Sequence, residues 1–216
     1  MTEGPIGLIA AHVCQKNHIP YTTTFHTKFP EYLHMRNRLV REEYVHEYLR
    51  YIHGGAEQIF ISNEGLRNYL DQNGYSRIQL IPFGIDHSVF FSGEKTLFHE
   101  LPSPILLFVG RIAVEKNIDD FLAILSEYTK IVVGDGPLLK KYEKKYKDVL
   151  FLGKKTAKEL SLIYRSADIF VFPSKTDTLG LVNLEAMACG LPVIAYDTEN
   201  TRGIIQDGKT GALVPE

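Results

Sequence analysis

The feature that most constrains the fold is the alternation of short apolar runs and longer amphipathic runs from Pro104 to the end of the chain. The short runs are rich in β-branched and aromatic residues, which favours strands, and the longer runs have helical spacing. Fully apolar strands that alternate with helices of about ten residues indicate βαβ units and a parallel sheet covered on both faces. The predicted strands are PILLFVG, KIVVG, VLFLG, DIFVFPS, PVIAY and GALVP, and the predicted helices are NIDDFLAILSEY, GPLLKKYEKKYK, TAKELSLIYRSA and LVNLEAMA.

The first hundred residues show the same alternation less regularly. The pattern predicts helices in IGLIAAHVCQKN, near Arg36–His53 and in NEGLRNYLDQN, and strands in PYTTTFH, QIFIS and IQLIPFG. The segment after them has no period and ends in two prolines, so we place an inter-domain connection over 92–103. The expected architecture is α/β, with a partial Rossmann-like parallel-sheet domain over 1–91 and a second over 104–216. The chain opens on a helix and closes on a strand, so we expect both domains to be incomplete.

Composition and charge exclude several classes of protein. The net charge of -2 gives no reason to expect nucleic acid as a partner. The two cysteines, Cys14 and Cys189, lie in apolar helical patterns, which is typical of reduced core residues. No apolar run approaches the about 18 residues that a membrane span requires, and Glu3 stands where a signal peptide carries positive charge. We therefore expect a cytoplasmic protein; a peripheral contact with the inner face of a membrane stays open.

The aromatic-rich helix NRLVREEYVHEYLRYIH is the segment that would suggest membrane binding. Its apolar residues stand at 39/40, 44/45, 48/49 and 51/52, which is the spacing of a stripe facing a protein core. We therefore predict that this stripe is buried in the first domain.

A candidate anion site comes from two loops that each follow a predicted strand. In open α/β sheets the carboxyl ends of the strands form the edge where ligands bind. The run FVGRIAVEKN supplies Arg111, whose planar fork can hold phosphate oxygens, and Lys116, which adds a point charge. In FPSKTDTLGLVNLEAMACG a helix begins after a glycine turn, so the backbone N–H groups of Gly180, Leu181 and Val182 can face an anion.

Two carboxylates, Asp177 and Glu185, stand on either side of this helix start. Each proposed site residue has a simpler alternative. Arg111 and Lys116 could be solvated surface cations, Glu185 could be exposed on its helix, and Asp177 could serve only as a helix cap.

Other phosphate and metal signals are incomplete. Gly134 and Gly136 begin a dinucleotide fingerprint, but Leu139 stands at its third glycine, which disfavours an NAD-linked oxidoreductase. A P-loop would require glycine at position 148, where the chain has Asp148. The sequence has no Asp-x-Asp pair and no His-Glu-x-x-His run, so we predict no metal and expect cations and helix dipoles to neutralise a bound diphosphate.

At this point the chain resembles the family 4 (group 1) glycosyltransferases, which are retaining enzymes with the two-Rossmann GT-B fold. The motifs that carry the resemblance are VGRIAVEKN, VVGDGP, ADIFVFPS and DTLGLVNLEAMACGLPVIA, in that order. The N-terminal TEGPIGLIA and PYTTTFHTKFPEYL are similar to the branch that includes α-mannosyltransferases acting on lipid or glycan acceptors.

The resemblance implies roles for the loop residues. Arg111 and Lys116 would bind the donor diphosphate, and Glu185 would hold the ribose hydroxyls of the nucleotide. Asp177 would touch hydroxyls of the donor sugar, at a position where the family usually has glutamate; we read this difference as subfamily variation.

His26 matches the histidine of the N-terminal domain that faces the donor, and the implied catalytic residues are His26 and Asp177. Leu152 and Gly153 fall where the backbone meets the nucleotide base. The implied donor is a nucleotide-diphosphate sugar, GDP-mannose in preference to a UDP-sugar, and the acceptor is a glycan or a lipid. The resemblance also implies that the leaving phosphate itself takes the acceptor proton. The alternative is a catalytically incomplete chain that at most binds nucleotide sugar.

Overall fold

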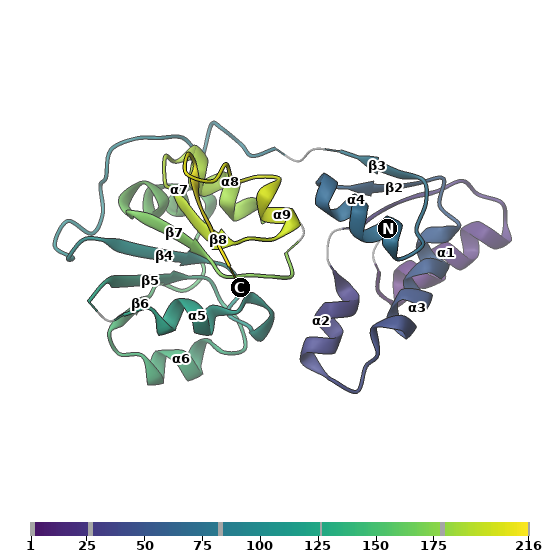
Figure 1. The fold of residues 1–216 in the computed structure, drawn as a ribbon, viewed down its shortest axis with the longest axis horizontal. Helices are drawn as coiled ribbons and strands as arrows, with labels where there is room; N and C mark the ends of the chain where they lie inside the picture. The colour runs from purple at the N-terminus through teal and green to yellow at the C-terminus, as the bar shows by residue number, and fades with distance from the viewer. Residues whose placement is uncertain (1–2, 26–27, 82–83, 126, 178–179, 216) are drawn as a thin grey trace. The chain divides into compact units, whose positions relative to one another are not determined.

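The computed structural model describes residues 3–25, 28–81, 84–125, 127–177 and 180–215. The chain divides into two compact units, and each unit has a parallel sheet of its own (Figure 1). The first unit comprises Met1–Phe83 with Thr176–Leu179, and the second comprises Gly84–Lys175 with Gly180–Glu216. The connection predicted over 92–103 groups with the second unit.

The second unit contains a six-stranded sheet in which all neighbouring strands are parallel. The strand order is β6-β5-β4-β7-β8-β9. Its elements in chain order are β4 (Ile105–Val109), η1 (Val114–Lys116), α5 (Ile118–Ala123), β5 (Thr129–Val133), α6 (Leu139–Lys145), β6 (Val149–Phe151), α7 (Ala157–Ser166), β7 (Ile169–Phe172), α8 (Leu181–Ala188), β8 (Val193–Tyr196), α9 (Glu199–Arg202) and β9 (Gly211–Val214).

The central strand β4 is buried on both faces. Ile105, Leu107 and Val109 belong to the cluster that includes residues of α7 and α8, whereas Leu106 and Phe108 belong to the cluster that includes residues of α5 and α6. The two pairs of helices lie on opposite faces of the sheet (Figure 1). This double burial is the reason why the strand is apolar without alternation, and it confirms the predicted covered parallel sheet.

The first unit contains a three-stranded parallel sheet in the order β1-β2-β3. Its core joins Ile59 and Ile61 of the central strand to apolar residues of the third and fourth helices. The predicted α/β class with two parallel sheets is confirmed. The elements in chain order are α1 (Pro5–Lys16), β1 (Thr22–Thr24), α2 (Phe29–Arg36), α3 (Glu42–Gly54), β2 (Gln58–Ile61), α4 (Glu64–Gln72) and β3 (Ile78–Leu80).

The single helix predicted near Arg36–His53 is wrong at its start. One helix ends at Arg36 and the next begins at Glu42. The Asn37 side chain accepts a hydrogen bond from the backbone N–H of Leu39 at 3.1 Å. The backbone carbonyl of Asn37 accepts one from the N–H of Val40 at 2.9 Å. This local turn competes with helical hydrogen bonding and separates the two helices.

The apolar stripe predicted for the aromatic-rich segment is only partly buried. Val45, Leu49 and Ile52 lie in the core of the first unit. The prediction is wrong for their neighbours, because Leu39, Tyr44 and Tyr51 are 89%, 64% and 44% exposed. Among the described residues no helix combines the length and the apolar character that a membrane crossing requires.

A buried histidine joins three elements of the first unit. Nδ1 of His46 lies 3.2 Å from Tyr75 Oη, and its Nε2 lies 3.3 Å from Tyr69 Oη. The Tyr69 hydroxyl donates to Glu31 Oε2 at 2.9 Å, so its single hydrogen is used there. The hydrogen between His46 and Tyr69 must therefore be on Nε2, which leaves Nδ1 as the acceptor for Tyr75. This arrangement fits a neutral imidazole.

We expect the first unit to lose stability as the pH falls below 6.5, the ordinary pKa of histidine. Burial and the nearby Arg50 lower the pKa of His46, although Glu42 and Glu43 oppose the shift. Between the folded and unfolded pKa values the unfolded chain therefore binds more protons, and acid favours unfolding. Hydrogen exchange of the α3 peptide at about pH 5.5 and 7.5 measures the effect. His46→Gln should reduce the acid sensitivity, and an identical pH dependence in the variant would contradict this assignment.

Candidate functional site

The sheet of the second unit has a topological switch point between β4 and β7. These two strands are hydrogen-bonded neighbours, with Leu107 opposite Phe170. From β4 the chain continues outward to β5 and β6, and from β7 it continues in the opposite direction to β8 and β9. In such sheets the connections leave a crevice at the carboxyl ends of the two central strands. The loop after β4 carries Arg111 and Lys116, and the loop after β7 leads into α8.

The loop after β4 is held by backbone contacts to the loop after β5. Gly110 N–H donates to Val133 O at 3.0 Å, and Ile112 N–H donates to Asp135 O at 2.9 Å. A Cβ at Gly134, where φ is +139°, would lie 1.9 Å from the carbonyl oxygen of Gly110. The glycine at this position therefore permits close approach of two main chains, a role that the incomplete dinucleotide fingerprint did not suggest.

Arg111 itself is exposed, and its side chain forms no ion pair with any residue that the structure describes. Lys116 is half-buried at the last position of η1, and Asn117 follows it with a left-handed φ of 49°. Both cations therefore lie in the segment that directly follows β4, which is where the sequence placed them.

The loop after β7 ends at Gly180, which is the N-cap of α8 and has a left-handed φ of 65°. No side chain of the described residues caps this helix. The first-turn N–H groups of Leu181 and Val182 therefore give the helix an electropositive start, as expected for an anion site. The N-cap position of α8 belongs to Gly180 and not to Asp177.

The predicted site residues fall into two groups. One group belongs to the second unit: Arg111 and Lys116 in the loop after β4, and the start of α8 with Glu185 in its second turn. Asp177 belongs to Thr176–Leu179, which groups with the first unit. His26 lies outside the described residues.

Glu185 is half-buried in the second turn of α8, so the alternative of a fully exposed side chain is wrong. Its Oε2 accepts a hydrogen bond of 3.1 Å from the hydroxyl of Tyr164 on α7. Burial raises the pKa of Glu185, whereas the hydrogen bond from Tyr164 lowers it. The carboxylate is therefore held in a defined place within a partly desolvated environment.

Two buried polar side chains, one in the loop after β7 and one in the first turn of α8, were not predicted as site residues. Ser174 and Asn183 are 3% and 0% exposed, and the Ser174 hydroxyl and both ends of the Asn183 amide lack hydrogen-bond partners among the described residues. A buried polar group without a partner costs about 1–3 kcal/mol, so both are candidates for contact with a ligand or an ordered water. The sequence carries no signal for them, since serine after a strand and asparagine in a first helical turn are common.

The loop after β6 adjoins the same backbone network. Gly134 N–H donates to the carbonyl of Gly153 at 2.9 Å, and Leu152 N–H donates to Val132 O at 2.9 Å. A Cβ at Gly153 would meet nothing within 4 Å, so the space beside it is open. Leu152 and Gly153 thus stand at the carboxyl edge, two strands from β4.

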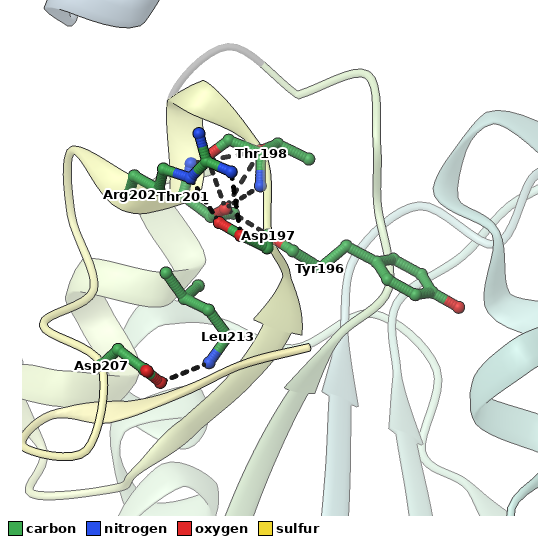
Figure 2. A network of polar contacts seen from close by, with 7 residues as sticks. All are labelled: Tyr196, Asp197, Thr198, Thr201, Arg202, Asp207 and Leu213. Atoms are coloured by element: carbon green, nitrogen blue, oxygen red, sulfur yellow. Dashed lines mark hydrogen bonds and ion pairs between the residues drawn. The ribbon is translucent and has the colours of Figure 1, made fainter. Parts of the chain in front are cut away.

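After β8 another cation, Arg202, is paired with a carboxylate of the same segment (Figure 2). Arg202 donates to both oxygens of Asp197, from Nε at 2.5 Å and from Nη2 at 2.9 Å. Thr198 and Thr201 form a capping box that holds the short helix α9, and the pKa of Asp197 is lowered by its hydrogen bond with Arg202. Arg202 is therefore committed to a local pair, in contrast to Arg111.

Among the residues that the structure describes, no three His, Cys, Asp or Glu side chains gather in a way that could hold a metal ion.

Comparisons with known families divide the chain near the boundary of the two units. Residues 94–216 match the family described as Glycosyl transferases group 1, and residues 1–89 match the family described as Glycosyltransferase Family 4.

Individual relatives agree with these matches. The chain is 29% identical to alpha-monoglucosyldiacylglycerol synthase of Streptococcus pneumoniae, with 98% of this chain and 54% of the relative covered. It is 28% identical to a GDP-mannose-dependent alpha-mannosyltransferase of Mycobacterium tuberculosis, with 97% and 57% covered. The structure of sucrose-phosphate synthase from Thermosynechococcus elongatus superposes with a TM-score of 0.84 at 25% identity, over 97% of this chain and 58% of that one. The chain thus spans about half the length of the curated relatives it matches.

Proposed function

The chain belongs to the glycosyl transferases group 1, and from this premise we propose the reaction that it serves. It transfers a hexosyl group, in the first instance mannosyl, from a nucleotide-diphosphate sugar to a glycan or lipid-linked acceptor, with retention of configuration. The observation that carries the proposal is that two features suited to anion binding follow neighbouring strands at one switch point. An arginine follows β4, and an uncapped helix start follows the neighbouring strand β7.

The chemistry of such a transfer suits these residue types. As the bond to the anomeric carbon breaks, negative charge grows on the leaving diphosphate. Arg111 and Lys116, together with the N–H groups of Gly180, Leu181 and Val182, would stabilise this charge more in the transition state than in the ground state. In our proposal no metal takes part, because fixed cations and peptide dipoles supply the countercharge.

The remaining residues divide between sugar and nucleotide. Glu185 would accept hydrogen bonds from the ribose hydroxyls, and Leu152 and Gly153 would border the base. Asp177 would bind a hydroxyl of the donor sugar, and His26 would bind the sugar or polarise a phosphate oxygen.

GDP-mannose is the preferred donor in this proposal. The support is the mycobacterial relative, which is a GDP-mannose-dependent alpha-mannosyltransferase. A UDP-sugar is the alternative donor. A sugar other than mannose also fits the relatives, among them the sulfoquinovosyl transferase SQD2 of Arabidopsis thaliana, 31% identical over 90% of this chain.

A second candidate function is binding of a nucleotide sugar without transfer. This chain matches 42% of the Arabidopsis relative and 54% of the streptococcal one, so transfer by the whole protein is itself part of the proposal. The two candidates share the donor site and differ only in turnover.

Isothermal titration with GDP, UDP and NAD in the presence of EDTA tests the donor site. Micromolar binding of GDP or UDP would support it, whereas tight binding of NAD with neither nucleotide would overturn it. A transfer assay with radiolabelled GDP-mannose and UDP-sugars then separates an enzyme from a binding protein. Nucleotide binding without transfer to any acceptor would select the second candidate.

We expect the two carboxylates to fail in different ways. Glu185→Ala should weaken GDP or UDP binding by about 10- to 100-fold, since hydrogen bonds to a charged group contribute about 1.5–3 kcal/mol. Asp177→Ala should leave nucleotide affinity within about twofold of the wild type, because its proposed partner is the sugar, and should reduce transfer by about 100-fold. Titration and initial rates measure the two effects. Equal losses of nucleotide affinity in both variants would show that these roles are misassigned.

A further inference from the structure

Tyr164 is a fully buried side chain that contacts the proposed site residue Glu185. It is 0% exposed, and its ring packs edge-on against Phe170 at 5.7 Å and against Phe90 at 6.1 Å, with interplanar angles of 82° and 65°. These contacts fix the ring, and a tyrosine ring that is fixed also fixes its hydroxyl. The hydroxyl donates to Glu185 Oε2 at 3.1 Å.

The hydroxyl of Tyr164 affects Glu185 in two ways. Glu185 has several rotatable bonds and is only half-buried, so a rigid donor on one oxygen restricts its conformers. The same donor favours the ionised form of the carboxylate, against the effect of burial, which raises the pKa of Glu185. Without the hydroxyl the carboxylate would be less ordered and more easily protonated.

We propose that Tyr164 is a positioning residue for nucleotide recognition, acting through Glu185 on the ribose hydroxyls. The inference rests on the proposed function, because it assumes that Glu185 binds the ribose. The bond from Tyr164 occupies one carboxylate oxygen and leaves the other, Oε1, as an acceptor for hydroxyl hydrogens. A carboxylate accepts such hydrogens on both oxygens, whereas the protonated acid must donate from one of them.

The test measures how tightly Tyr164→Phe and the wild type bind a nucleoside diphosphate, UDP or GDP. The same two proteins are then titrated with the 2′,3′-dideoxy analogue of that nucleotide, which lacks the ribose hydroxyls. Phenylalanine keeps the ring and removes only the hydroxyl. The wild type should bind the complete nucleotide more tightly than the analogue, and the ratio of the two affinities should fall by about tenfold in the variant. Affinity for the analogue should be the same in both proteins. At lower pH the variant should lose affinity for the complete nucleotide earlier than the wild type does, because its Glu185 protonates at a higher pH.

A matched control is available in the same unit. Tyr142 is 1% exposed and donates to Asp119 Oδ2 at 2.6 Å, so Tyr142→Phe also removes a buried hydroxyl from a carboxylate. It should lower the melting temperature comparably and leave the affinity ratio unchanged. The double variant Tyr164→Phe/Glu185→Gln should have the same ratio of affinities for the complete nucleotide and its analogue as Glu185→Gln alone.

The possible outcomes separate this inference from the function on which it rests. An unchanged affinity ratio in Tyr164→Phe overturns the inference, and so does an equal loss for both nucleotides, which would mark a purely structural tyrosine. If the wild type binds neither GDP nor UDP, the proposed function fails and the inference falls with it. If the wild type binds both nucleotides and their analogues equally, the ribose role of Glu185 fails while the diphosphate site stands.

Discussion

Arg111→Ala is expected to lower the rate of sugar transfer, as kcat/KM, by about 100- to 1000-fold, the loss that follows removal of one preorganised charge from a developing anion. The guanidinium is exposed at the carboxyl edge of the sheet and has no ion pair in the described part of the chain, so it is available to a ligand. GDP or UDP affinity should fall by about 30-fold, since a charge-assisted hydrogen bond contributes about 2 kcal/mol. Calorimetry and initial rates provide the two measurements.

The control for Arg111→Ala must remove the same charge from a different edge of the sheet. Lys147 precedes β6, so it lies toward the amino ends of the strands, and among the described residues its Nζ donates only to the carbonyl of Glu143 at 2.9 Å. Lys147→Ala should leave nucleotide affinity and transfer within about twofold of the wild type. A loss in Lys147→Ala comparable to that in Arg111→Ala would indicate that net charge alone governs binding, and the assigned contact would be rejected.

Gly134→Ala is expected to destabilise the second unit by more than about 4 kcal/mol, a large share of the about 5–15 kcal/mol that holds a typical domain. The new methyl group would lie 1.9 Å from the carbonyl oxygen of Gly110, at a φ of +139° that alanine rarely adopts. The methyl group is fixed to the backbone and the atom that it meets is a backbone carbonyl, so no side-chain rotation can relieve the clash. The melting temperature of this unit should fall by at least about 10 °C, measured by calorimetry with hydrogen exchange to assign the transition to the second unit.

Two further glycines separate the clash from the backbone strain. Gly208 also has a left-handed φ, +71°, but a Cβ there meets nothing within 4 Å, so Gly208→Ala should cost only about 1–2 kcal/mol. A Cβ at Gly84 also meets nothing within 4 Å, and no left-handed φ applies, so Gly84→Ala should change stability by less than about 0.5 kcal/mol. If Gly134→Ala is no more damaging than Gly208→Ala, the main chains of the two loops can move apart and the contact is not required.

The parts of the fold that could be predicted are those that depend on local sequence patterns. Residues 105–109 are all buried, and an unbroken apolar run of this length between helical segments indicates such a strand directly. The start of α8 was predictable because Gly180 precedes a run of helix-forming residues. The break after Arg36 was missed, although Asn37 is a residue that favours turns, because the apolar spacing continued across it.

The candidate site was predictable to the level of loops and not of contacts. Arg111 and the start of α8 could be assigned to one edge because parallel strands bring their carboxyl ends together. The bond between Tyr164 and Glu185 joins two helices, and no local pattern signals it. The role of Gly134 depends in the same way on which strand lies beside β5, and the sequence shows only that a glycine is present.

The strand order of the second unit also has a consequence for how the protein acquires its crevice during synthesis. The two strands that border the crevice, β4 and β7, are hydrogen-bonded neighbours, yet β5 and β6 are made between them and pair on the other side of β4. A nascent chain can therefore assemble one half of the sheet early, but it must close a long loop before β7 can dock. Until then the crevice lacks the helix start that follows β7, and we expect a ribosome-bound intermediate that ends before β7 to have no affinity for nucleotide.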